Sequence, residues 1–152
     1  MLSTTREALP ESIGQKLEST EWHTVDQTQI QLFADATLDQ QYIHTDPELA
    51  AKTPFGSTIA HGFLSLSMLA YFAESFGVQL EGAYMGINYG FDKVRFLTPV
   101  KVDSRIRCNA TVSGAVEKNP GQFMISFSVE IEIEGEDKPA LIAEWITMQM
   151  VK

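Results

Sequence analysis

One stretch of this sequence constrains the fold more than any other. From Thr58 to Phe76 the chain is apolar on nearly every side of a helical projection. A helix with so little polar surface has to be covered by other parts of the molecule. The spacing therefore predicts a long buried helix over about 58–76, and the remaining residues must supply its covering.

Everything after Glu81 has the composition of β-strands. The runs are rich in Val, Ile, Phe and Thr and are separated by Gly, Pro and Asn, which is typical of antiparallel strands joined by turns. With the helix, they predict an α+β fold in which a curved antiparallel sheet of about five strands wraps the long helix. The expected strands are Ala83–Tyr89, Lys93–Phe96, Ser104–Val116, Phe123–Glu134 and Ala140–Val151.

The region before the long helix mixes several kinds of element. Residues 1–13 are interpreted as an N-terminal leader or a first helical turn, and Gly14–Val25 as a first strand. A start resembling a capping box at Asp26 predicts a helix that ends near Leu38. A short helix is expected over 47–52, because it begins with a proline.

Composition and charge narrow the classes of protein. The chain has 152 residues, of which 44% are hydrophobic, so we expect a single domain spanning 1–152. A formal charge of −9 disfavours binding to nucleic acid or to anionic lipid, and no stretch is apolar for long enough to span a membrane. With one cysteine, Cys108, and no evident secretion signal, a cytoplasmic location is expected.

The cations are unevenly distributed along this acidic chain. They could meet the phosphates of a small ligand, or they could form salt bridges on solvated strand faces, and the sequence leaves both interpretations open. The residues concerned are Lys93, Arg95, Lys101, Arg105 and Arg107.

Candidate chemistry lies between the first helix and the long one. Asp39 and His44 are five residues apart in an irregular segment, where a loop that turns back could bring both within reach of one water; they could equally be structural loop residues. Gly62 lies where the long helix begins, and the free N–H groups of a helix start can stabilise a developing negative charge. We interpret His61 as a helix-start histidine bonded to backbone.

Other common sites have no counterpart in the sequence. It contains no phosphate-binding Gly-Lys-Ser/Thr loop, no dinucleotide fingerprint and no Cys-x-x-Cys pair. The histidines at positions 23, 44 and 61 lack the spacing of a metal site. We therefore expect acid/base chemistry with neither a metal nor a cofactor of the protein's own.

Two separated segments carry a resemblance to a known family. FADATLDQQYIHTDP (33–47) and FGSTIAHGFLSLS (55–67) closely resemble the hydratase motif of the MaoC-like (R)-specific enoyl-CoA hydratases, and the nearest subgroup is the NodN-like one. NYGFDKVRFLTPV (88–100) also resembles a strand of that subgroup. The resemblance implies the hot-dog fold, a long helix wrapped by an antiparallel sheet, and a homodimer.

The resemblance assigns roles by position in the motif. Asp39 and His44 fall on the catalytic Asp and His, and Gly62 falls on the glycine whose N–H faces the thioester oxygen. Gln41 takes the place of an Asn that supports the loop. Leu38 stands where the family commonly has Gly, so a left-handed turn there would strain this residue.

The implied reaction interconverts trans-2-enoyl and (R)-3-hydroxyacyl thioesters. Coenzyme A or acyl carrier protein would enter as part of the substrate. An acyl channel is expected along the long helix, past Phe63, Leu66 and Tyr71. The phosphates of coenzyme A would meet cations at a dimer edge, with Lys93, Arg95 and Arg105 as candidates.

Two alternatives remain at this level. A hot-dog thioesterase usually places its carboxylate on the long helix, where this chain has Glu74 near the far end. The other alternative is a non-catalytic module that binds acyl thioesters and has lost turnover because of the altered loop at Leu38.

Overall fold

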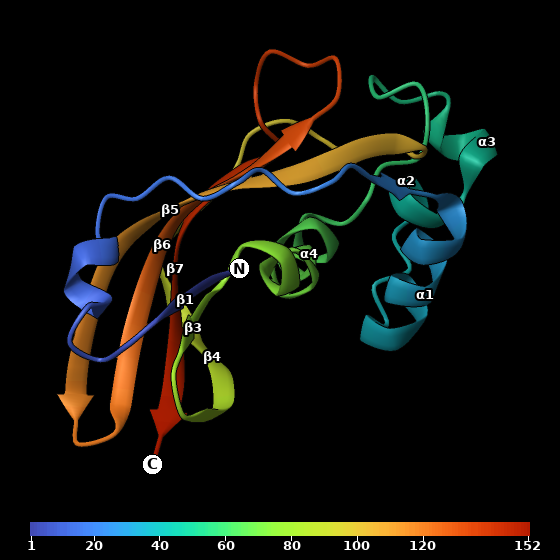
Figure 1. Cartoon of the computed structure of the whole chain (residues 1–152). Helices are drawn as coiled ribbons and strands as arrows, with labels where there is room; N and C mark the ends of the chain where they lie inside the picture. The colour runs from blue at the N-terminus through green and yellow to red at the C-terminus, as the bar shows by residue number, and fades with distance from the viewer.

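The computed structural model describes residues 1–152 and is dominated by one curved sheet. Its five strands are antiparallel and lie in the order β2-β5-β6-β7-β4. The sheet curls around a single long helix, α4 (Figure 1), so the predicted α+β architecture is confirmed. The strands are β2 (His23–Val25), β4 (Ala83–Phe96), β5 (Ser104–Asn119), β6 (Gln122–Ile133) and β7 (Leu141–Val151).

The core lies between α4 (Gly62–Phe76) and the concave face of the sheet. Every second side chain of β6 is buried, as the two-residue period of a strand requires. From α4, Leu69 and Phe72 are almost fully buried, and Phe76 packs edge-on against Phe127 of β6 with ring centroids 5.9 Å apart.

The helix is nevertheless not covered on all sides. Phe63 and Tyr71 are 67% and 54% exposed, so the expectation of a helix buried all round is met on the sheet side alone. The neighbouring edge strand β4 is also largely exposed. Its exposed apolar side chains, called the β4 face below, are Tyr84, Met85, Ile87, Tyr89 and Phe91.

Several predicted boundaries differ from the structure. The long helix starts at Gly62 instead of Thr58, because the backbone of 58–60 is drawn into pairing with 100–102: Ala60 N–H donates to Val100 O at 2.7 Å. Gly90 does not separate two strands, since β4 runs through it with local shifts of register, as at a β-bulge. The predicted strand 14–25 is reduced to β2 and an isolated bridge at Lys16.

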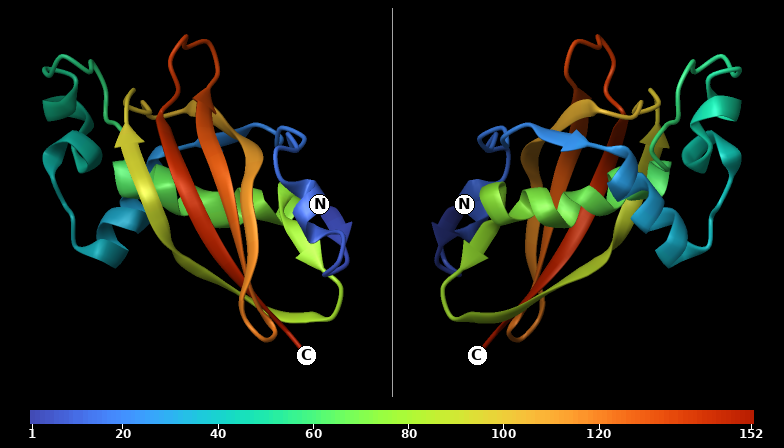
Figure 2. Two further views of the ribbon diagram at one scale, coloured as in Figure 1. Left: turned by 90° about the vertical axis from the view of Figure 1, so that its left-hand side faces the viewer. Right: turned by 90° about the vertical axis from the view of Figure 1, so that its right-hand side faces the viewer.

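Residues 1–13 pack against the rest of the chain. β1 (Leu2–Thr4) pairs in parallel with β3 (Val78–Leu80), directly after α4. A short 3-10 helix, η1 (Leu9–Ser12), carries Pro10 in its first turn, and Leu9 is only 2% exposed. Figure 2 shows this segment at one end of α4 and the three other α-helices at the opposite end.

Those three helices are α1 (Gln27–Thr37), α2 (Tyr42–Thr45) and α3 (Pro47–Ala50). The predicted start of α1 is confirmed: the Asp26 carboxylate accepts a hydrogen bond from Gln29 N–H at 2.8 Å, which satisfies a donor at the helix start. The group lies beside the first turn of α4 (Figures 1 and 2). No helix of the structure has both the length and the apolar character needed to cross a bilayer.

Candidate active site

His44 lies on the one-turn helix α2 and is only 7% exposed. Its Nδ1 is 2.6 Å from the carbonyl oxygen of Ile59. A carbonyl can only accept, so Nδ1 carries the proton and Nε2 is the nitrogen with the free lone pair. The backbone is held as well, because Ile59 N–H donates to Ile43 O at 3.0 Å. His44 is therefore fixed in the tautomer that leaves Nε2 free to accept a proton.

A side chain that sequence reasoning missed supports this arrangement. The Gln27 amide nitrogen donates to the carbonyl of His44 at 2.8 Å, and its oxygen accepts from the Thr58 hydroxyl at 2.5 Å. Thr58 is 1% exposed. Gln27 thus links α1, α2 and the segment before α4. No local pattern marks it, because its partners lie 17 and 31 residues away.

Asp39 follows α1 through a strained turn. Leu38, which ends α1, has φ 65° and ψ 16°, so the chain makes a left-handed turn here with a leucine in place of the family's usual glycine. That conformation costs a non-glycine residue about 1–2 kcal/mol. The Asp39 side chain is exposed, and its Oδ1 accepts a long hydrogen bond of 3.4 Å from Gln41 N–H.

Gln41 supports the loop through its backbone. Besides the bond to Asp39, its carbonyl accepts from His44 N–H at 2.9 Å. Its side chain makes no capping hydrogen bond at the start of α2. Gln41 thus contacts the loop through its backbone, and the supporting role assigned to it by the motif stays a prediction.

His61 joins Asp39 to His44. It is the N-cap residue of α4, and its Nε2 donates to the carbonyl oxygen of Asp39 at 3.0 Å, as expected of a helix-start histidine bonded to backbone. Its ring stacks on that of His44, with centroids 3.8 Å apart and planes 24° apart. One polar atom each of Asp39, His44 and His61 lie within 4.8 Å of one another.

The stacking limits what these three residues can bind. Lone pairs of imidazole lie in the ring plane, and a metal ion binds there at about 2.0–2.1 Å. Two rings stacked at 3.8 Å direct their lone pairs along nearly parallel planes, so both cannot ligate one ion without turning.

The surroundings of His44 favour its neutral form. Burial lowers its pKa from the ordinary value of 6.5, the charge of His61 acts in the same direction, and the hydrogen bond to Ile59 and the Asp39 charge oppose it. Because burial is the largest influence, the net shift is downward. At neutral pH, His44 is therefore available as a base.

A cavity of about 310 Å³ opens beside His44. Gly62 contributes to its wall as the first residue of α4, where backbone N–H groups have no partner within the helix. A Cβ at Gly62 would lie 3.0 Å from two ring carbons of Phe96. Only glycine fits under this ring without displacing it. The other lining side chains include Phe55, Ser65, Leu97 and Val100.

The predicted acyl-channel residues lie elsewhere. Phe63 points outward against Phe96, with ring centroids 5.9 Å apart, and Tyr71 packs against His23. Leu66 lines a separate, smaller depression. None of the three lines the cavity beside His44: Phe63 and Tyr71 are exposed, and Leu66 shares its depression with Phe91 and Trp145 of the sheet.

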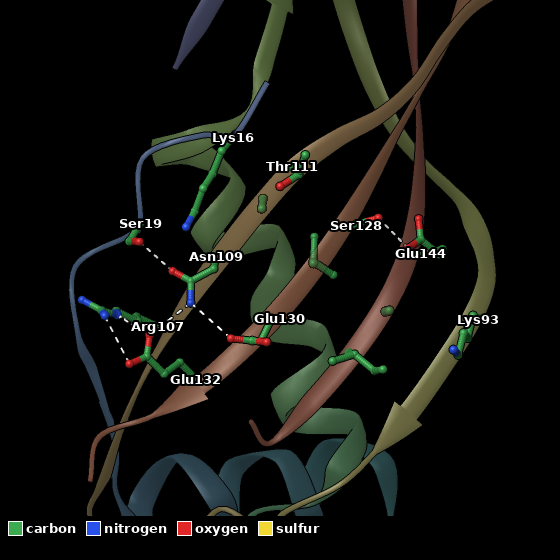
Figure 3. Close-up of a pocket in the computed structure, with 14 residues that line it drawn as sticks. Lys16, Ser19, Lys93, Arg107, Asn109, Thr111, Ser128, Glu130, Glu132 and Glu144 are labelled. Atoms are coloured by element: carbon green, nitrogen blue, oxygen red, sulfur yellow. Dashed lines mark hydrogen bonds and ion pairs between the residues drawn. The ribbon is translucent and has the colours of Figure 1, made fainter. Parts of the chain in front are cut away.

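The cations clustered in sequence are divided in space. Lys93 and Arg95 lie on edge strand β4, whereas Arg105 and Arg107 lie on β5, and β6 and β7 separate the two. Figure 3 shows Arg107 and Lys93 at opposite sides of the outer face of the sheet. β4 and β5 are consecutive in the chain but are not neighbours in the sheet, so closeness in sequence is lost.

The β5 cations are engaged in salt bridges. Arg105 contacts Glu134 at 2.9 Å and Arg107 contacts Glu132 at 2.7 Å. Both guanidinium groups also lie over the ring of Trp22. The salt-bridge interpretation is therefore confirmed for these two, and the phosphate-binding role of Arg105 stays a prediction.

Cys108 has no reactive surroundings. It is fully buried on β5, and burial raises the pKa of its thiol to about 12. A thiol that resists ionisation is a poor nucleophile, so Cys108 is a small core residue and not a reactive one.

Comparison with known proteins decides the family. The model of the MaoC like domain matches residues 8–133. The chain belongs to the MaoC-like domain family. This MaoC-like chain is 49% identical over 141 residues to Nodulation protein N of Rhizobium leguminosarum bv. viciae, covering 92% of the chain and 88% of that protein.

A second relative has a name that describes an activity. The 3-hydroxyacyl-thioester dehydratase Z of Mycobacterium tuberculosis (strain ATCC 25618 / H37Rv) is 43% identical over 138 residues, covering 91% of each chain. Among solved structures, a Monoamine oxidase regulatory protein from Archaeoglobus fulgius superposes with a TM-score of 0.76 at 26% identity, covering 100% of this chain and 99% of that one. The MaoC-like chain has the hot-dog fold of its structural neighbours.

Proposed function

We propose that this MaoC-like protein is a hydro-lyase that interconverts trans-2-enoyl thioesters and (R)-3-hydroxyacyl thioesters, with Asp39 and His44 as its acid/base pair. Membership of the family and 43% identity to a 3-hydroxyacyl-thioester dehydratase support this class of reaction. The observation that carries the assignment to this site is His44: a buried histidine with Nδ1 tied to backbone and Nε2 free, beside Asp39 and a cavity.

In hydration, Asp39 and His44 hold one water between them. As the water oxygen bonds to C3 of the enoyl thioester, one member of the pair removes a water proton and the other delivers a proton to C2. Transfer of a proton between the two side chains, whose polar atoms lie within 4.8 Å, restores the starting state. Neutral His44 suits the role of proton acceptor.

The thioester oxygen gains enolate character during this step. We assign its stabilisation to Gly62 N–H and the start of α4, where unpaired N–H groups and the helix dipole favour negative charge. Removal of one such donor from an enzyme typically costs about 3–4 kcal/mol of transition-state stabilisation. The reacting end of the acyl group would occupy the cavity beside His44.

The proposed enzyme works as a homodimer, with the β4 face and the open side of α4 covered by a second copy. An edge strand that exposes several large apolar side chains is a surface that proteins normally cover. Phe63 and Tyr71 continue this surface on α4. The acyl channel predicted past Phe63, Leu66 and Tyr71 would then lie between the two copies.

The acyl group of the substrate is linked as a thioester to coenzyme A or to acyl carrier protein. The proposal includes no metal or bound cofactor. Lys93 and Arg95 on β4 form none of the salt bridges in the structure, so they remain candidates for coenzyme A phosphates at the dimer edge. We place the enzyme in the cytoplasm, where the unpaired thiol of Cys108 would stay reduced.

The direct test follows the enoyl absorbance of crotonyl-CoA and a longer trans-2-enoyl-CoA with wild type and Asp39→Asn. Wild type should consume both and give the (R)-alcohol, and Asp39→Asn should lose at least about 10²-fold in kcat, the typical contribution of one acid/base group. Asp137→Asn, an exposed acid in the β6–β7 loop, serves as the matched control and should keep full activity.

Two other outcomes would overturn the proposal. Release of free thiol would identify a thioesterase, which the position of Glu74 disfavours, since it is exposed near the far end of α4 from His44. A wild type that binds acyl-CoA without turnover, with binding unchanged in Asp39→Asn, would identify a non-catalytic thioester-binding module.

A further inference from the structure

His61 occupies a position that its hydrogen bond to Asp39 does not fully explain. The residue is 2% exposed, and its Nδ1 is buried without a hydrogen-bond partner. Leaving a buried polar atom unpaired typically costs about 1–3 kcal/mol. A phenylalanine would fill the same space between Phe33 and His44 without that cost, so the function of this histidine must come from Nε2.

The partner of Nε2 is the backbone of Asp39, in the exposed loop between α1 and α2. The other bonds of this loop are made by the residues after Asp39: the Gln40 amide donates to Asp35 at 2.7 Å, and the Gln40 carbonyl accepts from Thr45 at 3.2 Å. Leu38 holds a strained left-handed conformation, and Asp39 is exposed with one long hydrogen bond to its carboxylate. The bond from His61 Nε2 to the Asp39 carbonyl is 3.0 Å and comes from a buried side chain at the N-cap of α4. It therefore ties the exposed partner of the acid/base pair to the buried imidazoles of the site.

His61 also determines where His44 lies, because the two rings are stacked at 3.8 Å. Gly62, the proposed donor to the thioester oxygen, is the next residue in the chain. One side chain thus sets the relative positions of the carboxylate loop, the imidazole and the helix start. A displacement of about 1 Å between such groups can cost about 10²-fold in rate.

We propose that His61 is a positioning residue that holds Asp39 in register with His44 through its Nε2–H bond to the Asp39 carbonyl. This inference rests on the proposed hydratase function for its kinetic consequence, but the bond itself can be tested without substrate. His61 touches neither substrate nor reacting atoms in this assignment. Its contribution is the geometry of the pair.

Two substitutions separate the hydrogen bond from the packing. His61→Phe keeps an aromatic ring against His44 and removes both the donor and the unpaired Nδ1. His61→Gln loses the ring, but its amide nitrogen lies at nearly the position of Nε2 and can donate to Asp39. A purely structural role predicts that Phe is the better replacement, whereas the positioning role predicts that Gln is.

The experiment measures kcat and KM on crotonyl-CoA, thermal stability, and backbone ¹⁵N order parameters for residues 39–41 in wild type and both variants. We expect His61→Phe to retain stability, to lose about 10²-fold in kcat with little change in KM, and to lower the order parameters from rigid values towards about 0.6. His61→Gln should remain within a few-fold of wild type in kcat, with a rigid loop, even if it unfolds at a lower temperature.

The proposal is overturned if His61→Phe keeps wild-type kcat and a rigid loop, or if activity in the two variants simply follows their stability. It is also overturned if ¹⁵N-histidine spectra of the wild type place the His61 proton on Nδ1. Should the wild type turn over no enoyl thioester, the proposed function fails separately, and the order parameters and the tautomer still decide whether His61 positions Asp39.

Discussion

Two cavities of this molecule differ in whether their polar side chains are paired with one another. The larger, about 620 Å³, lies on the outer face of the sheet (Figure 3), and the smaller, about 310 Å³, lies beside His44. On the outer face, polar side chains bond to one another: Ser19 to Asn109, Ser128 to Glu144, and Arg107 to Glu132. Beside His44, polar atoms are left without protein partners.

The difference teaches that a site is marked by polar groups that the fold has not satisfied. Paired charges on an exposed strand face gain little from a ligand, since they already have partners and water. A buried imidazole with one unpaired nitrogen lowers the stability of the fold, so its presence indicates a function other than folding. The predictions below test this contrast, beginning with the largest expected effect.

The first substitution disturbs the inner cavity by one methyl group. Gly62→Ala places a Cβ 3.0 Å from the Phe96 ring, which lines the cavity, so the ring must shift and the cavity changes shape. We expect kcat/KM for enoyl-CoA to fall by up to about 10²-fold, with little loss of stability, as measured by steady-state kinetics and urea unfolding. Gly114→Ala, whose Cβ would meet Ser126 at an ordinary 3.5 Å, is the control and should be active.

The second prediction concerns pH. Because burial lowers the pKa of His44, kcat/KM should stay level at neutral pH and fall on the acid side with an apparent pKa below 6.5, tenfold per unit at the limit. As pH falls, His44 is protonated in the unfolded chain at a higher pH than in the folded chain. The stability that neutral His44 contributes is therefore complete above pH 6.5 and is lost as pH falls to its lowered pKa. An acid limb centred above 6.5 would contradict the assignment of His44.

A third substitution removes strain beside the site. Leu38→Gly should raise the free energy of unfolding by about 0.5–1 kcal/mol, since relief of the left-handed conformation exceeds the greater freedom of glycine in the unfolded chain. Leu38 is 83% exposed, so little burial is lost. Leu32→Gly, also exposed but inside α1, should instead destabilise by about 1 kcal/mol. Urea denaturation measures both, and equal signs would refute the strain argument.

The smallest effect is expected on the outer face. Arg107→Ala breaks the bond to Glu132, but both side chains are about one-third exposed, so the loss of stability should lie within about 1 kcal/mol. Activity should not change. A large fall in kcat/KM for enoyl-CoA in this variant would mean that the outer face takes part in the site after all.

The sequence alone was sufficient where local chemistry decides structure. The alternation in β6 and the Asp26 cap depend on neighbouring residues, and both predictions are confirmed. The apolar run before Phe76 predicted the long helix, although α4 begins at Gly62 and is buried on the sheet side alone. The left-handed turn at Leu38 was also predictable, because a family motif marks the place. The roles of Asp39 and His44 stay predictions that kinetics must test.

Tertiary structure decided the features that depend on distant partners. The cations of β4 and β5 are close in sequence but end on strands separated by two others, since chain order and sheet order differ. Gln27 and His61 are linked to the site by hydrogen bonds to residues 17 and 22 positions away, which form only when the chain folds. Periodicity and capping act within a few residues and can be read from the chain. Sheet order and hydrogen bonds between loops are fixed only when the whole core packs.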